Sequence, residues 1–143
     1  MKCICYVLTL LISVITLSAC DNKQSVTEQD LRHHRFVAIK LNNETINSNS
    51  QNFIEFGENF TINGKMCNAF SGQAALTNDT INVAHLISTE MLCSDEQQNQ
   101  LDFVINQLLQ HGATVILNKT ADKQSLTLKN NENEIVFKLH DLM

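Results

Sequence analysis

Residues 95–110 read DEQQNQLDFVINQLLQ, and the apolar period of this stretch differs from that of every other segment of the chain. The aliphatic residues recur at intervals of three and four, at Leu101, Val104, Ile105, Leu108 and Leu109. This spacing predicts an amphipathic helix with one apolar stripe. Such a stripe needs an apolar surface to pack on, and the rest of the chain predicts what that surface is.

The two ends of this helix also carry recognisable signals. Ser94 offers a side-chain oxygen for an N-cap, and Asp95 and Glu96 suit the positive end of the helix dipole. Gly112 suits the C-terminal end. A second, shorter helix is expected near residue 28, because Thr27 and Asp30 have the spacing of a capping box.

Short apolar segments typical of strands lie on both sides of the long helix. They cover residues 36–41, 53–56, 59–63, 70–77, 80–86, 114–118, 125–129 and 134–139. Asn42-Asn43 and Asn78-Asp79 are turn-forming pairs, and the second suits a two-residue hairpin. Most segments have one apolar face, which is typical of a curved antiparallel sheet with one solvated side. We therefore predict an α+β fold of about seven or eight strands, with one principal helix packed on the sheet.

The N-terminus predicts export and lipid attachment. Lys2 precedes a largely apolar run that ends at Leu17 and is shorter than the roughly 20 residues needed to span a bilayer. The run closes in residues 17–20, LSAC, which resembles a bacterial lipobox with Cys20 as the acylated residue. We expect a signal peptide over 1–19, a lipidated cysteine and tether over 20–26, and one domain over 27–142. An ordinary secretory signal is the alternative.

These features also predict where the protein works. A lipid on Cys20 would anchor the chain in the bacterial envelope with the domain facing the periplasm. Asp21, directly after it, favours the inner membrane, and the outer membrane is the alternative. The chain is acidic, with 15 Asp and Glu against 10 Lys and Arg. This balance argues against nucleic-acid binding and against an electrostatic attachment to anionic lipid, because both need clustered basic residues. We expect a monomer.

Five cysteines are present, and processing leaves two of them in the mature domain. Cys3 and Cys5 would leave with the signal peptide and Cys20 would carry lipid, so Cys67 and Cys93 remain in a compartment that favours disulfides. A bridge between them would stabilise the fold by about 3–4 kcal/mol on the chain-entropy estimate. Two free buried thiols are the alternative.

The sequence contains no recognisable catalytic or cofactor motif. His33 and His34 are adjacent, so their side chains diverge and do not chelate one metal as a pair. Ser71 lacks the preceding glycine of a nucleophile elbow, and we expect it in a turn. No stretch matches a phosphate-binding loop or a dinucleotide fingerprint. A zinc site of Cys67, His85 and Cys93 would need the sulfurs that a disulfide uses. We therefore expect no enzyme, no catalytic residue, no metal and no cofactor.

Two segments joined by the expected bridge form a candidate recognition patch. Residues 64–72, GKMCNAFSG, are rich in glycine and are expected to connect two strands, because glycine and asparagine tolerate unusual backbone angles. Residues 89–93, TEMLC, precede the long helix. A bridge would staple them into a rigid corner. The candidate residues are Gly64, Cys67, Asn68, Phe70, Ser71, Gly72, Thr89, Met91 and Cys93.

The same two segments resemble the META domain family, which has Gly-x-x-Cys-Asn-x-Phe-Ser-Gly followed by Thr-x-Met-x-Cys. Residues 33–36, HHRF, and 56–58, FGE, are also similar. The resemblance covers Thr27 to Leu142. It implies a small conical or cracked β-barrel with a helix packed on it and no catalytic residues. It also implies a role in envelope stress, including heat and tolerance of novobiocin.

Three functional hypotheses follow. The first is a non-enzymatic lipoprotein that supports the stressed envelope by binding an envelope protein or an apolar, lipid-like ligand inside the barrel. The second is an inhibitor of a periplasmic or host hydrolase such as lysozyme, since an acidic domain suits a basic target. The third is a redox enzyme that uses Cys67 and Cys93, which their wide separation disfavours.

Overall fold

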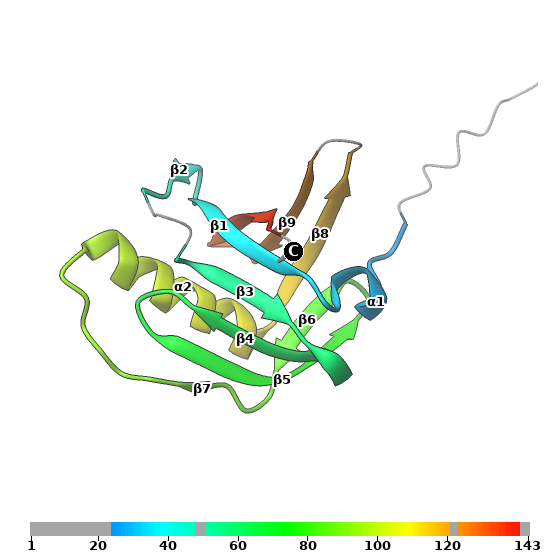
Figure 1. Ribbon diagram of the computed structural model, residues 1–143, viewed down its shortest axis with the longest axis horizontal. Helices are drawn as coiled ribbons and strands as arrows, with labels where there is room; N and C mark the ends of the chain where they lie inside the picture. The colour runs from blue at the N-terminus through cyan, green and yellow to red at the C-terminus, as the bar shows by residue number, and fades with distance from the viewer. Residues whose placement is uncertain (1–23, 48–50, 121–122, 141–143) are drawn as a thin grey trace, which may run out of the picture.

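Eight antiparallel strands close into a barrel in this computed structural model, which describes residues 24–47, 51–120 and 123–140 (Figure 1). The expected signal peptide, Cys20 and Asp21 lie outside these residues. In order around the barrel, the strands are β1 (Arg35–Leu41), β3 (Phe53–Phe56), β4 (Thr61–Lys65), β5 (Ala69–Thr77), β6 (Thr80–Val83), β8 (Ala113–Lys119), β9 (Gln124–Lys129) and β10 (Glu134–Leu139).

Pairing between the first and last strands closes the ring. β1 and β10 run antiparallel from Phe36↔Leu139 to Leu41↔Ile135, with a register shift between Ala38 and Lys40. The α+β prediction of a small barrel with one main helix is therefore confirmed. Two short strands were not predicted: β2 (Glu44–Thr45) pairs with β1, and β7 (Ile87–Ser88) pairs with β5.

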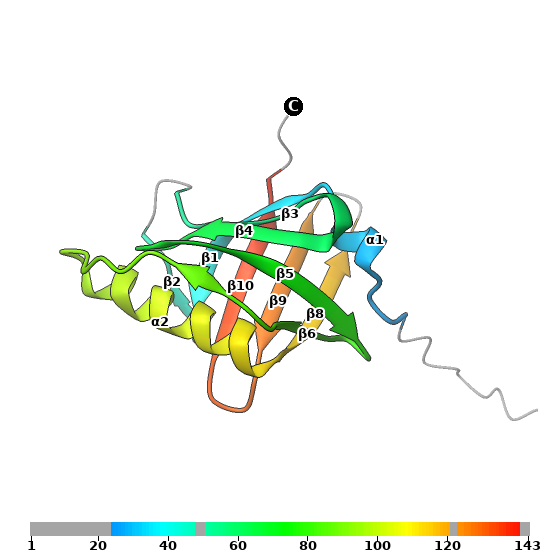
Figure 2. The ribbon, with the colours of Figure 1, turned by 90° about the horizontal axis from the view of Figure 1, so that it is seen from below.

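The barrel has a weak seam, and the long helix lies beside it. β6 and β8 pair only at Thr80↔Thr114 and Ile81↔Ala113. Helix α2 (Glu96–His111) packs against β6, and Figure 2 shows it running along this side of the barrel. All five residues of the predicted apolar stripe are buried. The helix thus covers apolar surface that the short β6–β8 pairing leaves open.

The helix ends close to where they were predicted, with one correction at the N-cap. Asp95, not Ser94, caps α2, because its carboxylate accepts a hydrogen bond from the Gln97 backbone N–H at 2.9 Å. Gly112 follows the helix with a φ of 94°, a conformation that glycine adopts without strain.

Aromatic side chains fill the barrel. Phe36, Phe56, Phe60 and Phe137 are each at most 1% exposed and belong to one hydrophobic core with the stripe of α2. Phe56 and Phe60 stack with their ring centroids 5.6 Å apart, and Phe36 meets Phe56 edge-on at 6.2 Å. The interior is therefore occupied by the chain's own side chains.

The turns between strands depend on asparagine and aspartate in left-handed conformations. Asn78 and Asp79 have φ values of 49° and 57° and join β5 to β6, which confirms the predicted two-residue hairpin. Asn42 and Asn43, at 48° and 69°, turn the chain from β1 into β2.

Two strand predictions had wrong boundaries. The segment expected over 59–63 begins as the 3-10 helix η1 (Glu58–Phe60), and β4 starts only at Thr61. Asn59 and Phe60 have φ values of 53° and 57°, which no strand can accommodate. The segment expected over 80–86 ends at Val83, and the chain turns there before it enters β7.

Helix α1 (Glu28–Leu31) forms where the capping-box spacing placed it and is tied to the barrel. Asp30 accepts hydrogen bonds from the Thr27 backbone N–H at 2.9 Å and from the Thr27 hydroxyl at 2.6 Å. Lys119 of β8 also bonds to Asp30. The hydrogen bond from Lys119, followed by those from Thr27, lowers the pKa of Asp30 from 3.8 to about 2.

Replacing Asp30 by asparagine should destabilise the fold in a pH-dependent way. Because the folded-state pKa is depressed, the Asp30 carboxylate stabilises the protein above pH 4, and this contribution is lost as the pH falls toward 2. We expect Asp30→Asn to lower the free energy of unfolding at pH 7 by about 1 kcal/mol, with the difference from wild type shrinking between pH 4 and 2. Urea unfolding at pH 7, 4 and 2 measures both.

Glu28→Gln is the matched control, because Glu28 belongs to the same helical turn and its carboxylate accepts no hydrogen bond from any described residue. An equal loss in the two variants, or an Asp30→Asn difference that persists at pH 2, would contradict the role given to Asp30.

Among the described residues, no helix is long and apolar enough to cross a membrane.

Candidate functional site

An open groove of about 680 Å³ lies between residues 86–92 and helix α2, and we call it the α2 groove. One wall consists of Leu86 and residues 88–92, and the other consists of polar residues of α2 together with Phe103. Asn68, from the connection between β4 and β5, lines the groove as well. The groove therefore brings the β4–β5 connection together with residues 86–92 and α2, which follow later in the chain.

Asn68 ties these three segments together. Its side-chain oxygen accepts hydrogen bonds from the Met91 backbone N–H at 2.7 Å and the Thr89 hydroxyl at 3.0 Å. Its side-chain nitrogen donates to the Met91 carbonyl at 3.1 Å and to Asp102 of α2 at 2.9 Å. The Asn68 backbone N–H also donates to Asp102, at 2.9 Å. The amide thus pairs with the Met91 backbone in both directions, as a neighbouring strand would.

A disulfide and a second asparagine hold the far end of the 86–92 segment. Cys67 and Cys93 form a disulfide with a Cα–Cα distance of 5.9 Å. The Cys93 backbone donates to the Asn99 side chain at 2.9 Å and accepts from it at 2.8 Å. The segment is consequently fixed to both the β4–β5 connection and α2. With both sulfurs in the bridge, the zinc set with His85 does not form in this structure.

The surface of the α2 groove is apolar and acidic. Met91, Leu92 and Phe103 are 61%, 90% and 62% exposed, which is unusual for side chains of this size. Glu90 and Asp102 are the charged residues among those that line the groove, and both are acidic. Exposed apolar side chains on a fixed backbone, beside carboxylates that form no ion pair with the described residues, are typical of a surface that binds another molecule.

The predicted patch divides over two sides of β7. Asn68, Thr89 and Met91 line the α2 groove. On the other side of β7, a shallow hollow of about 400 Å³ is lined by residues that include Gly64, Phe70, Ser71, Thr89 and Ile87. Cys67 and Cys93 form the staple described above. Gly72 lines neither feature.

The prediction that residues 64–72 connect two strands was wrong at both ends, and Ser71 does not lie in a turn, because the strand predicted over 70–77 includes it. Gly64 belongs to β4, and Ser71 and Gly72 belong to β5. Gly64 and Gly72 are needed for close packing and not for unusual backbone angles. A Cβ on Gly64 would lie 2.2 Å from the Phe70 ring, and one on Gly72 would lie 2.4 Å from a methyl group of Val83.

Most residues that line the α2 groove were not among the predicted site residues, and they include Leu92, Asn99, Asp102 and Phe103. Phe103 did carry a signal, because a phenylalanine on the polar face of an amphipathic helix has no core to enter. Asn99 and Asp102 carried none, since polar residues on that face look alike in sequence.

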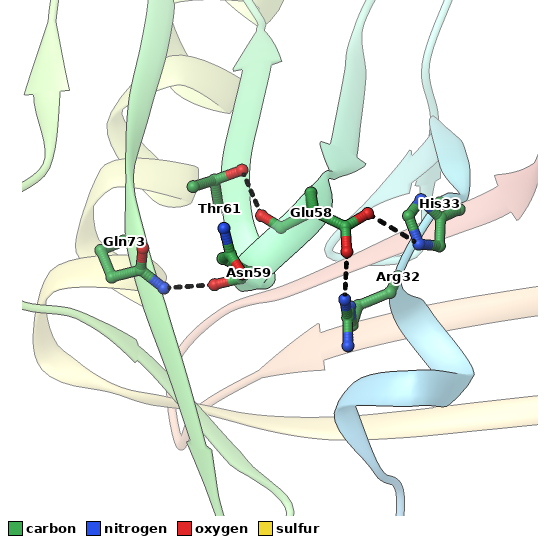
Figure 3. Close-up of polar contacts among 6 residues, drawn as sticks. All are labelled: Arg32, His33, Glu58, Asn59, Thr61 and Gln73. Atoms are coloured by element: carbon green, nitrogen blue, oxygen red, sulfur yellow. Dashed lines mark hydrogen bonds and ion pairs between the residues drawn. The ribbon is translucent and has the colours of Figure 1, made fainter.

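A second polar cluster, between α1 and η1, links the two elements without forming a site of its own (Figure 3). Arg32 and His33 lie 2.8 Å and 3.3 Å from the two carboxylate oxygens of Glu58. Gln73 donates to the Asn59 carbonyl at 2.7 Å, and Thr61 donates to the Glu58 carbonyl at 3.1 Å. These contacts satisfy the left-handed turn at Asn59. Within the described residues, no three His, Cys, Asp or Glu side chains gather as a candidate metal site.

Comparison with known proteins agrees with this architecture. The META domain matches residues 29–141. Heat shock protein HslJ of Escherichia coli (strain K12) is 40% identical over 124 residues, which is 86% of each chain. A protein solved by NMR shares 39% identity with a TM-score of 0.72, over 82% of this chain and 98% of that one.

A second NMR structure, of a protein from Burkholderia xenovorans, shares only the fold. It has 18% identity and a TM-score of 0.66, over 80% of this chain and 87% of that one. The match of the META domain to most of the chain and the identity to HslJ establish the relationship. This chain belongs to the META domain family.

Proposed function

We propose that this protein is a non-enzymatic lipoprotein of the bacterial envelope that supports the cell under stress by binding a protein partner in the α2 groove. Membership of the META domain family and the likeness to a heat shock protein support the stress role, which we extend to heat and novobiocin tolerance. The lipobox-like residues 17–20 support the anchor.

The observation that carries the proposal is the rigid, exposed apolar surface of the α2 groove. Leu92 and Phe103 are exposed, yet the segment and helix that bear them are fixed by the disulfide, Asn68 and Asn99. Fixing a binding surface in advance lowers the entropy that association costs. The phenylalanine-filled barrel favours a partner on the surface over a lipid-like ligand inside.

The position of the anchor also favours a protein partner. The described chain begins beside α1, at one end of the long axis in Figure 1, and the segment leading into α2 lies at the other end. A lipid on Cys20, a few residues before Gln24, would leave a tether on the order of 15 Å long. The end of the α2 groove at residues 91–92 would then lie on the side of the domain opposite the tether.

Placing a charge in the groove should abolish function without unfolding the protein. We expect Leu92→Asp and Phe103→Asp each to weaken partner binding about 30-fold, the effect of losing a central apolar contact. Both side chains are exposed, so thermal stability should stay close to wild type. The assay is survival of a deletion strain, complemented with each variant, at elevated temperature and on novobiocin.

Ile87→Asp is the matched control, because Ile87 is 71% exposed and its side chain lines the hollow on the other side of β7. A photo-crosslinking residue at Leu92 adds a direct readout in living cells. We expect a protein adduct that disappears in Phe103→Asp and persists in Ile87→Asp. Full complementation by both groove variants would refute the proposal, and loss in Ile87→Asp alone would move the site to the hollow.

A further inference from the structure

We infer that the partner binds as an extended peptide segment with basic and apolar residues. This segment adds as a strand to the unpaired edge that β7 and the residues after it form, at Ser88 and Glu90. This inference rests on the proposed function and deepens it, because it names the class of partner and the way in which it is held.

The first observation is an unpaired strand edge. Within the described residues β7 pairs with β5 alone, at Phe70↔Ser88 and Ser71↔Ile87. The Thr89 N–H donates to the Ala69 carbonyl at 3.0 Å, so the Thr89 backbone faces β5. Backbone groups alternate in direction along a strand, so the N–H and C=O groups of Ser88 and Glu90 point away from β5.

The second observation is that this edge borders the α2 groove. In Figure 2 the light-green strand β7 lies between β5 and α2. Ser88 and Glu90 line one wall, and Asp102 and Asn106 line the other. An unpaired edge beside an open groove is the arrangement in which an extended peptide adds to a sheet.

The third observation is that the edge stays extended beyond the end of β7. Asn68 accepts from the Met91 N–H at 2.7 Å and donates to the Met91 carbonyl at 3.1 Å. These two bonds extend the pairing between β5 and β7 to Asn68, the residue directly before β5. Glu90 therefore lies between two fixed points, Thr89 and Met91, and Ser88 lies between the β5-paired Ile87 and Thr89. The backbone of both residues needs little ordering when a peptide pairs with it.

The lining of the groove determines the chemistry of the peptide. Glu90 and Asp102 carry negative charge, and none of the residues lining the groove is Lys, Arg or His. Both Asp102 oxygens already accept bonds from Asn68, so Asp102 supplies charge. Glu90 is exposed and has no ion-pair partner among the described residues, so it can pair with a basic side chain of the peptide. Leu92 and Phe103 offer apolar contacts. Alternating basic and aliphatic residues fit this lining, because strand side chains alternate between faces.

The test uses the full-length protein in a mild detergent and a capped peptide of about nine residues in which valine alternates with lysine. NMR of the labelled protein measures binding and amide hydrogen exchange. We expect exchange at Ser88 and Glu90 to slow roughly tenfold or more on binding. A peptide with glutamate in place of lysine should bind about tenfold more weakly.

Ser88→Pro tests the edge itself. The Ser88 N–H points away from β5, so proline removes the outward donor and leaves the bonds to β5 in place. We expect the affinity for the valine–lysine peptide to fall about tenfold. Ser88→Ala measures the share due to the hydroxyl, which bonds to the Thr89 carbonyl at 3.1 Å. If Ser88→Pro does not fold, a peptide N-methylated at alternate residues removes the same hydrogen bonds from the other side.

Three results would overturn the inference: no binding of the valine–lysine peptide, binding that leaves Ser88 and Glu90 exchange unchanged, or binding that survives N-methylation. The crosslink at Leu92 shows whether only the strand-addition inference fails or the proposed function fails as well. An adduct that is lost in Phe103→Asp and retained in Ser88→Pro would mean that the groove binds a protein by another geometry. If the wild-type protein gives no crosslink at Leu92 and does not bind the valine–lysine peptide, both the proposed function and this inference are refuted.

Discussion

Asn68→Ala should lower the free energy of unfolding by about 3 kcal/mol or more, because it removes four side-chain hydrogen bonds at a site that is only 5% exposed. The Met91 N–H and the Asp102 carboxylate would each lose a partner, and bonds to charged groups are the costlier ones to lose. Urea unfolding followed by circular dichroism measures the change. We also expect faster amide exchange at Met91 and its neighbours, since Asn68 holds the Met91 backbone to the β4–β5 connection.

Asn52→Ala makes the same substitution at another buried asparagine and serves as the control. Asn52 is 1% exposed, and its side-chain nitrogen has no hydrogen-bond partner in the part of the chain that the structure describes. Its loss should cost about 1 kcal/mol, since less bonding is broken. If the two variants lost equal stability, burial and not the hydrogen-bond network would account for the effect of Asn68.

Local patterns were sufficient to predict most of the elements. The stripe of α2 was readable because a helix repeats its apolar face every three or four residues. The hairpin at Asn78 and Asp79 was readable because few residues adopt left-handed angles at two successive positions. The 3-10 helix at Glu58–Phe60 was missed because Phe60 and Ile62 also fit a strand's alternation.

Closure of the barrel depended on contacts that no local pattern records. β1 pairs with β10 across nearly the whole domain, and either strand alone is compatible with an open curved sheet. Strands as short as β2 and β7 have no period to detect. The resemblance to the META domain supplied the expectation of a barrel, and the pairing of Phe36 with Leu139 completes it.

The candidate site was predictable only in part, for the same reason. Counting cysteines singled out Cys67 and Cys93, which form the disulfide, and the motif around them contains Asn68. The opposite wall of the groove comes from α2, whose polar face gives no sign of what it faces. Only Phe103 breaks that face, and an exposed aromatic on a predicted helix is a useful marker for a binding surface.

Removing the disulfide should destabilise the fold and loosen the wall of the groove near Cys93. The double variant Cys67→Ser/Cys93→Ser opens a loop with a sequence separation of 26 residues, for which the chain-entropy estimate predicts a loss of about 3–4 kcal/mol. Reductant should lower the stability of wild type to that of the variant and leave the variant unchanged. Because Asn68 and Asn99 still hold residues 89–93, we expect the barrel to fold and amide exchange to rise mainly at Met91 to Cys93. A loss below about 1 kcal/mol would show that these hydrogen bonds, rather than the bridge, order the wall of the groove.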